Sequence, residues 1–236
     1  KPMVEIGGRP ILWHIMRGYA HHGYNEFVLS LGYQSFFIKE YFLQFKHRHN
    51  DFTVQTGTGE IINHMKADTP DWRVTLADTG EETLKGARIA RVREHLGDGP
   101  FMVTYGDGVG NVDIGNLVEF HKKSGRIGTF TGVHMPSRFG AVEADADGRI
   151  LSWKEKPILT DYINAGFFVF EPEFLDYLSE DPECDLEKAP LERLAGEGEL
   201  SMYRHEGFWH CMDTYRDKLE LNQMWHSGQA EWKVWP

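Results

Sequence analysis

The chain has 236 residues, with 25 Lys and Arg against 36 Asp and Glu, so its formal charge at pH 7 is −11 with His neutral. This acidic balance argues against a long nucleic-acid groove, because phosphate binding would oppose the field of the whole protein. Hydrophobic residues make up 41% of the chain and charged residues 26%, which is typical of a globular protein and excludes disordered and fibrous classes. No apolar run approaches the ~20 residues that a bilayer span requires, so we expect no membrane partner.

The two cysteines, Cys184 and Cys211, lie far apart in the chain and form no C-x-x-C motif. Their spacing predicts neither a disulfide framework nor a zinc site. The first residues also lack the basic and then apolar pattern of a signal peptide. We therefore expect the reducing cytoplasm as the location of the protein.

Helical and strand periodicities alternate along the first half of the chain. Pro10 suits the first turn of a helix that carries apolar residues at helical spacing and ends near Gly23. Further helices are predicted over residues 37–45, 89–96 and 114–122, and strands over residues 27–31, 52–56, 73–77 and 101–105. This order predicts an α/β sandwich with a mainly parallel central sheet.

The second half of the chain is richer in antiparallel signals. Two short strands, 141–144 and 149–153, flank the turn Asp145-Ala146-Asp147-Gly148 and predict a hairpin. One long strand is predicted over residues 162–170, and helices over residues 172–178, 186–194 and 214–225. Since no Pro- or Ser-rich linker, repeat or low-complexity segment separates the two halves, we expect residues 1–236 to form a single domain with an antiparallel-rich C-terminal half.

Asp107 is a candidate metal ligand. It follows the predicted strand 101–105 and lies between Gly106 and Gly108. Ligands of open α/β sheets bind beyond the carboxyl ends of strands, and flanking glycines let a large ligand approach a carboxylate. A loop Asp that only turns the chain explains the position equally well.

Asp213 is a second candidate, because it follows the otherwise apolar, aromatic-rich stretch 208–212. The next residue, Thr214, predicts a helix N-cap whose capping-box partner is Asp217. The cap accounts for Thr214 but leaves the carboxylate of Asp213 without an explanation.

Two segments could bind phosphate. Lys156 lies between Glu155 and Pro157 and could hold a phosphate group, although a solvated charge pair at a strand end is the simpler interpretation. The Gly-containing loop 79–88 leads into a helix, and it can offer backbone N–H groups and the Arg88 guanidinium to a phosphorylated ligand. No Ser-His-Asp or Cys-His constellation can be nominated from the sequence, so covalent nucleophilic catalysis is not supported.

A set of short segments carries a family resemblance over nearly the whole chain. The segments are, in chain order, Lys1–Met16, Gly32-Tyr33, Ile38–Phe42, Val74–Gly80, Thr104–Val109, Arg138-Phe139-Gly140, Glu155-Lys156-Pro157, Asn164–Val169, Gly207–Trp209 and Met212-Asp213-Thr214. Together they resemble the sugar-phosphate nucleotidylyltransferases, and within that superfamily the glucose-1-phosphate cytidylyltransferases. The Tyr-Gly-Asp-Gly and Met-Asp-Thr segments are far more specific together than apart.

The resemblance implies a Rossmann-like nucleotidyltransferase fold and the reaction of CTP with α-D-glucose 1-phosphate to give CDP-glucose and pyrophosphate, for use in surface polysaccharides. Such a reaction needs positioning and charge neutralisation and no protein nucleophile. The resemblance also implies the site residues: Asp107 and Asp213 as catalytic ligands of Mg²⁺, Lys1, Thr83 and Arg88 facing the nucleotide, and Gly140, Glu155, Lys156 and Asn164 holding the sugar phosphate.

The chain departs from the family pattern in two places. The Gly-rich signature loop, Leu-Ala-Gly-Gly-x-Gly-Thr-Arg, is absent ahead of Lys1, and Ala165 stands where the family commonly has Gly. We expect the first strand and its loop to be missing upstream. Without them we expect residues 1–236 alone to be poorly soluble and inactive.

We expect the protein to form a homo-oligomer. Three alternatives accompany this interpretation of its function. One is a non-catalytic sugar-nucleotide-binding or regulatory protein of the same fold. A second is a sibling uridylyl- or thymidylyltransferase, because the choice of cytosine depends on the resemblance alone. The third is a glycosyltransferase, since Asp145-Ala146-Asp147 has the Asp-x-Asp form of its metal motif, but Gly148 favours a hairpin turn there.

Overall fold

The computed structural model describes residues 1–66, 68–137 and 139–236. Its helices are α1 (Ile11–His21), α2 (Ser35–Leu43), α3 (Phe45–His49), α4 (Lys85–Arg91), α5 (Ile114–Ser124), α6 (Ala189–Gly196) and α7 (Tyr215–His226), with 3₁₀ helices η1 (Arg93–His95) and η2 (Pro172–Tyr177). Its strands are β1 (Glu5–Ile6), β2 (Arg9–Pro10), β3 (Glu26–Leu31), β4 (Asp51–Gln55), β5 (Glu60–His64), β6 (Arg73–Asp78), β7 (Phe101–Val103), β8 (Gly108–Gly110), β9 (Gly128–Val133), β10 (Ala141–Ala144), β11 (Ile150–Lys154), β12 (Ile163–Asn164), β13 (Phe168–Phe170), β14 (Leu200–His205) and β15 (Trp209–Cys211).

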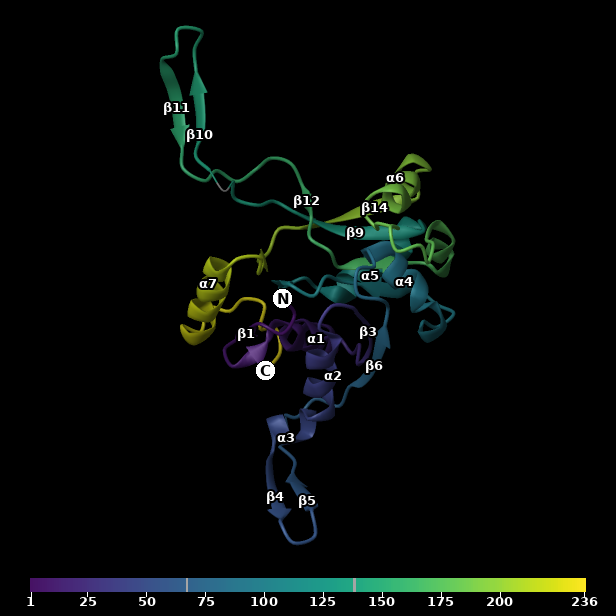
Figure 1. Ribbon diagram of the computed structural model, residues 1–236. Coiled ribbons are helices and arrows are strands. Elements are labelled where there is room, and N and C mark those ends of the chain that lie inside the picture. The colour runs from purple at the N-terminus through teal and green to yellow at the C-terminus, as the bar shows by residue number, and fades with distance from the viewer. Residues whose placement is uncertain (67, 138) are drawn as a thin grey trace.

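Figure 1 shows a mixed α/β body from which two hairpins, β4–β5 and β10–β11, project in opposite directions. The body contains a five-stranded sheet in which β9 pairs antiparallel with β12 and β13 and parallel with β14. β13 also pairs antiparallel with β7, and β3 and β6 form a separate parallel pair. The predicted α/β class is therefore confirmed, whereas among the residues that the structure describes parallel pairing is confirmed only for β3–β6 and β9–β14.

The single long strand predicted over residues 162–170 is wrong. β12 and β13 pair with opposite ends of β9, and the chain between them leaves the regular strand conformation. Gly166 has a φ of +79° and Phe167 a φ of +48°, both in the left-handed region. The backbone N–H of Gly166 donates to Asn164 Oδ1 at 2.9 Å, a local bond that competes with strand pairing.

Most elements with local sequence signals are confirmed. The hairpin around Asp145–Gly148 forms, and Thr214 and Asp217 make the predicted capping box at the start of α7. Three predicted helices differ. Residues 172–177 form the 3₁₀ helix η2, and the helix expected from residue 186 begins only at Ala189. The helix expected over residues 89–96 is the end of α4 followed by the 3₁₀ helix η1. Among the described residues, no helix combines the length and the apolar character that a membrane crossing requires.

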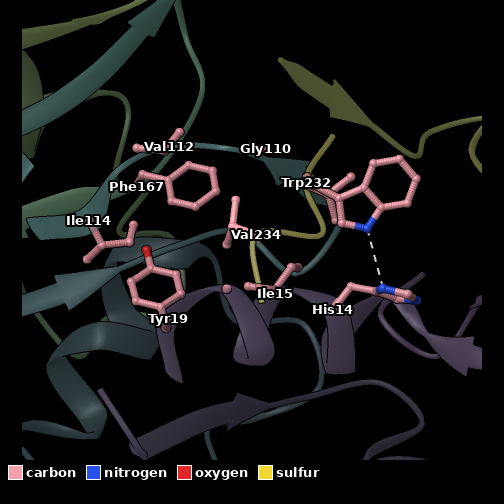
Figure 2. Close-up of a pocket in the computed structure, with 12 residues that line it drawn as sticks. His14, Ile15, Tyr19, Gly110, Val112, Ile114, Phe167, Trp232 and Val234 are labelled. Carbon is pink, nitrogen blue, oxygen red and sulfur yellow. Dashed lines mark hydrogen bonds between the residues drawn. The ribbon is translucent and has the colours of Figure 1, made fainter. Parts of the chain in front are cut away.

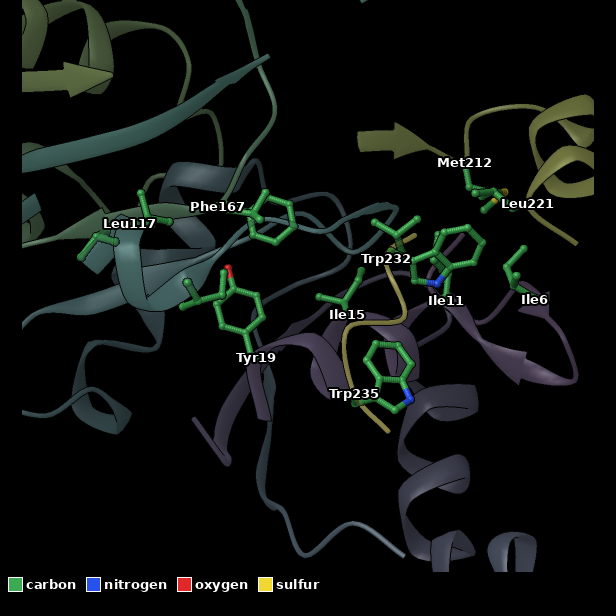
Figure 3. Packing of buried hydrophobic residues seen from close by; sticks show 14 residues of the cluster. Ile6, Ile11, Ile15, Tyr19, Leu117, Phe167, Met212, Leu221, Trp232 and Trp235 are labelled. Carbon is green, nitrogen blue, oxygen red and sulfur yellow. The ribbon is translucent and has the colours of Figure 1, made fainter. Parts of the chain in front are cut away.

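The larger hydrophobic core lies between α1 and the C-terminal segment, as Figure 3 shows. α1 contributes Ile11, Ile15 and Tyr19 from one face, at the helical spacing that predicted it. Trp232 and Trp235 are buried in the same core, so these C-terminal tryptophans pack against α1. Met212 is also buried there and so anchors the chain directly before Asp213.

His14 is a buried histidine of α1 with 1% of its surface exposed. It lines a small void of about 10 Å³. Figure 2 shows its hydrogen bond to Trp232. The indole N–H of Trp232 can only donate, so Nδ1 of His14 accepts at 3.3 Å, and Nε2 donates to the carbonyl of Ile6 at 2.8 Å. The neutral ring uses both nitrogens, and burial lowers the pKa of His14 to about 4.

We expect His14 to make the free energy of unfolding fall by about 3 kcal/mol as the pH is lowered from 6.5 to 4. In this window the unfolded chain binds a proton that the folded histidine does not; above it neither state binds the proton, and below it both do. Burial also lowers the pKa of His49 and His121, so these two histidines also make the free energy of unfolding fall as the pH is lowered. Denaturant titrations across the window should therefore show a smaller loss in His14→Gln than in the wild type, and equal losses would contradict the assignment.

Candidate active site

Asp107 and Asp213 are brought together by a strand pair. β8 and β15 are antiparallel, with Gly108 opposite Cys211. The backbone N–H of Met212 continues this pairing and donates to the carbonyl of Asp107 at 2.7 Å. Because Asp107 directly precedes β8 and Asp213 lies just beyond β15, both carboxylates reach the same end of the pair.

The ammonium group of Lys1 contacts both carboxylates. Nζ lies 2.6 Å from Asp213 Oδ1 and 3.5 Å from Asp107 Oδ2. Hydrogen bonding to Asp213 raises the pKa of Lys1, so the ammonium stays charged at neutral pH. The carboxylate side chains of Asp107 and Asp213 are 30% and 37% exposed, which leaves them accessible to a ligand.

The residues around Asp213 hold its backbone and its carboxylate. Asp217 Oδ2 accepts from the backbone N–H groups of Asp213 at 3.0 Å and Thr214 at 2.7 Å. The Cys211 thiol donates to Asp213 Oδ2 at 3.3 Å. Burial, followed by the hydrogen bond to Asp213, raises the pKa of Cys211 to about 11, so the group is a thiol and not a thiolate at neutral pH. It therefore acts as a donor to the carboxylate.

Both carboxylates line a cleft of about 550 Å³, a size typical of small-molecule sites. Tyr105 and Asn164 contribute to its wall from the end of β7 and from β12. Trp209 of β15 also lines it, and its indole N–H donates to the carbonyl of Ala165 at 3.1 Å. This hydrogen bond links β15, which precedes Asp213, to the segment between β12 and β13, which follows Asn164.

The predicted sugar-phosphate residues divide between the cleft and the projecting hairpin. Asn164 lines the cleft, whereas Gly140, Glu155 and Lys156 lie at the stem of β10–β11 and are not among the lining residues. A Cβ atom at Gly140 would lie 3.2 Å from Glu155 Oε2, so these two residues are adjacent across the stem. Arg138, the first residue of the Arg-Phe-Gly motif that ends at Gly140, lies outside the described residues.

Thr83 and Arg88, predicted to face the nucleotide, make contacts within their own region. Arg88 donates to Thr79 Oγ1 at 2.7 Å and to the carbonyl of Glu81 at 3.1 Å. Thr83 is buried and its hydroxyl accepts from Arg91 at 2.9 Å. These bonds order the loop that precedes α4, and neither residue lines the cleft. Of the three predicted nucleotide residues, Lys1 is the one that the structure joins to Asp107 and Asp213, and the roles of all of them stay predictions.

Asp107 and Asp213 offer a donor set that suits a divalent cation. Mg²⁺ in phosphoryl-transfer sites is typically bound by one or two carboxylates and completed by substrate phosphates and water. The ammonium of Lys1 shows that a positive charge is accommodated beside both carboxylates. Within residues 1–66, 68–137 and 139–236, no group of three or more His, Cys, Asp or Glu side chains could hold a metal ion. The remaining ligands would therefore come from phosphate oxygens or water.

The contacts of three residues in this region could not be predicted from the sequence. Tyr105 belongs to the Tyr-Gly-Asp-Gly motif, yet the motif gives no sign that its hydroxyl bonds to Asn164 and Glu187. Glu187 has no local signal at all, because it lies in an irregular segment ahead of α6. Arg91 donates to Thr83 and to the carbonyl of Thr79, whereas its sequence context predicts only a helical position.

Comparison with known proteins places the chain among sugar-phosphate enzymes. A family model described as nucleotidyl transferase matches residues 1–224. The chain is 44% identical over 235 residues to a probable glucose-1-phosphate cytidylyltransferase of Bacillus subtilis (strain 168), and 44% identical over 237 residues to the glucose-1-phosphate cytidylyltransferase of Salmonella typhi. Each match covers 100% of this chain and 91% of the relative.

Solved structures of low sequence identity share the fold. Apo-UDP-glucose pyrophosphorylase superposes with a TM-score of 0.69 at 13% identity, covering 97% of this chain and 91% of that one. HddC from Yersinia pseudotuberculosis superposes with a TM-score of 0.67 at 18% identity, covering 95% and 89%. These structures confirm the predicted fold, and the full-length relatives confirm the resemblance. The chain belongs to the nucleotidyl transferase family, in its branch of glucose-1-phosphate cytidylyltransferases.

Proposed function

We propose that this protein joins CTP and α-D-glucose 1-phosphate to form CDP-glucose and pyrophosphate. The observation that carries the proposal is the pair Asp107 and Asp213, which share the ammonium of Lys1 in the wall of the cleft. The pair occurs in a chain that matches glucose-1-phosphate cytidylyltransferases over its whole length. The product would serve polysaccharide biosynthesis.

The reaction forms one phosphorus–oxygen bond and breaks another. A phosphate oxygen of glucose 1-phosphate attacks the α-phosphorus of CTP, and the bond from that phosphorus to the bridging oxygen breaks as pyrophosphate leaves with the electron pair. Both substrates are anions, so the protein must hold them in line and offset their charge. The Lys1 ammonium, which contacts the two carboxylates in this structure, can instead pair with the triphosphate when CTP binds.

Asp107 and Asp213 would hold Mg²⁺, which would supply positive charge to offset the negative charge that develops on the leaving group. The support is their shared position and their oxygen donors. The thiol of Cys211 donates to one oxygen of Asp213, and Lys1 contacts the other, so that carboxylate is held in one orientation.

The remaining site residues divide between the two substrates. Thr83 and Arg88 would face the nucleotide together with Lys1, since they lie in and after the loop that offers N–H groups ahead of α4. The sugar phosphate would be held by Gly140, Glu155, Lys156 and Asn164, of which Asn164 lies in the cleft wall. In this arrangement the sugar side of the site includes the stem of the β10–β11 hairpin.

Pyrophosphate release from each of the four nucleoside triphosphates tests the proposed reaction. With glucose 1-phosphate held constant, we expect kcat/KM for CTP to exceed that for UTP about 100-fold or more, because cytosine presents an amino donor where uracil presents a carbonyl acceptor. A reaction without sugar phosphate is the control. A preference for UTP or dTTP would assign a sibling reaction, and nucleotide binding without pyrophosphate release would assign a binding protein.

We also propose a homo-oligomer in the cytoplasm. Large apolar side chains are exposed on α2 and on the β4–β5 hairpin, among them Phe36, Leu43 and Ile62. Exposed large apolar side chains support association. Light scattering of the purified protein tests the proposal, and a monomer at micromolar concentration would contradict it. Both cysteines are free thiols, which fits a reducing compartment.

A further inference from the structure

Tyr105 lies at the centre of a hydrogen-bonded group that the reaction described above does not use. Its hydroxyl donates to Glu187 Oε1 at 2.6 Å and accepts from Asn164 Nδ2 at 2.9 Å. Lys85, at the start of α4, pairs with the same oxygen of Glu187, and its ammonium lies 5.4 Å from the centroid of the Tyr105 ring. Four segments distant in the sequence therefore meet around Tyr105, which lines the cleft together with Asn164.

The group holds the amide of Asn164 in one orientation. The backbone N–H of Gly166 can only donate, so the Asn164 atom that it contacts at 2.9 Å is the oxygen, and the NH₂ group faces Tyr105. The tyrosine hydroxyl has one hydrogen, and the carboxylate of Glu187 accepts it, which leaves a lone pair for Asn164. Burial alone would raise the pKa of Glu187, but hydrogen bonds from Lys85 and Tyr105 lower this pKa below its usual value. Glu187 is therefore ionised and accepts these hydrogen bonds.

The backbone on the far side of Asn164 supports the same orientation. Gly166 has a φ of +79°, and a Cβ atom there would lie 3.0 Å from the ring of Tyr105, so the ring packs directly against the glycine backbone. The indole of Trp209 holds the carbonyl of Ala165. The break in the strand therefore serves to place one amide side chain against one tyrosine hydroxyl.

We propose that Tyr105 and Glu187 are positioning residues for glucose 1-phosphate, acting through the amide of Asn164. The inference rests on the proposed function. Asn164 lines the same cleft as Asp107, and its second N–H has no acceptor among the described residues. A donor fixed in this way suits an acceptor oxygen of the sugar phosphate, either a hydroxyl or a phosphate oxygen.

Tyr105→Phe tests the proposal, because it keeps the ring and removes only the hydroxyl. We expect the KM for glucose 1-phosphate to rise about three- to tenfold, with the KM for CTP and the thermal midpoint of unfolding close to wild type. The matched control is Tyr177→Phe, which removes the hydroxyl of another Tyr–Glu pair, Tyr177 with Glu197, outside the cleft lining. This control should change neither KM. An equal rise in both KM values in Tyr105→Phe would indicate a general structural role and overturn the proposal.

A double-mutant cycle tests whether Tyr105 acts through Asn164. In an Asn164→Ala background, adding Tyr105→Phe should leave the KM for glucose 1-phosphate unchanged within about twofold, because the amide that the hydroxyl positions is gone. Effects that multiply would overturn the proposal.

Deoxyglucose 1-phosphates that each lack one hydroxyl identify the acceptor of the Asn164 amide. If a sugar hydroxyl is the acceptor, the effect of Tyr105→Phe should vanish with the analogue that lacks it. If a phosphate oxygen is the acceptor, the effect should persist with every analogue.

Failure of this inference can be told apart from failure of the proposed function. If the wild-type enzyme releases no pyrophosphate from CTP and glucose 1-phosphate, the proposed function fails and the positioning role fails with it. If the wild type is active and Tyr105→Phe has both wild-type KM values, the positioning role alone fails.

Discussion

Asp107→Asn and Asp213→Asn are each expected to lower kcat by about 10²- to 10³-fold while the fold stays intact. Each substitution keeps the size of the side chain and removes its negative charge. The two carboxylates lie 3.5 and 2.6 Å from the same ammonium of Lys1, so either change removes half of the negative charge that would hold a divalent cation. Because this interaction is strongest in the transition state, the loss should fall on kcat.

Initial rates of pyrophosphate release at saturating CTP and glucose 1-phosphate measure this effect, and thermal unfolding reports on the fold. Asp176→Asn is the matched control, since the Asp176 side chain is 71% exposed in an ion pair with Arg93 and is not part of the cleft lining. The control should keep the wild-type rate. A kcat within about twofold of wild type for either site variant would contradict the catalytic role of that carboxylate.

Elements whose determinants lie within a few residues could be predicted from the sequence. The β10–β11 hairpin follows from its turn, where Asp145 Oδ1 accepts from the backbone N–H groups of Asp147 and Arg149 and Gly148 has a φ of +81°. The start of α7 follows from the capping box of Thr214. In both cases the sequence contains the whole hydrogen-bonded unit.

Elements that depend on distant partners could not be predicted. β8 and β15 are three residues each, too short for a period-2 pattern, and they exist because residues a hundred positions apart pair with each other. The break after Asn164 likewise needs Trp209, which holds the carbonyl of Ala165 from 44 residues away. An apolar run over residues 162–170 reads as one strand when these contacts are unknown.

The site residues could be named from the sequence but not assembled. Asp107 and Asp213 each have a local signal, whereas their meeting around Lys1 depends on the β8–β15 pair. Glu187 has no local signal because its function, as we propose it, comes entirely from a contact with Tyr105, 82 residues away. Positioning residues of this kind become visible only when the chain is folded.

Lys156 has a backbone conformation that non-glycine residues rarely adopt, with a φ of +45°. It follows β11 at the stem of the projecting hairpin. Next to it, the carbonyl of Pro157 accepts from the backbone N–H of Ser137 at 2.8 Å, and Ser137 lines the cleft. Strained positions held by surrounding structure concentrate at binding sites, which supports a role for Lys156 in holding a ligand.

Lys156→Ala is expected to raise the KM for glucose 1-phosphate about 10- to 100-fold and to leave the KM for CTP within about twofold, because a charge-assisted hydrogen bond to the sugar phosphate is lost. Steady-state kinetics with each substrate varied in turn measure both constants, and Lys154→Ala on the neighbouring β11 is the matched control. Lys156→Gly distinguishes the loss of the ammonium charge from an effect on the backbone conformation, because glycine adopts a positive φ without strain. A loss in Lys156→Gly as large as in Lys156→Ala would assign the effect to the ammonium, whereas an equal rise in both KM values would show that Lys156 serves the fold and not the sugar phosphate.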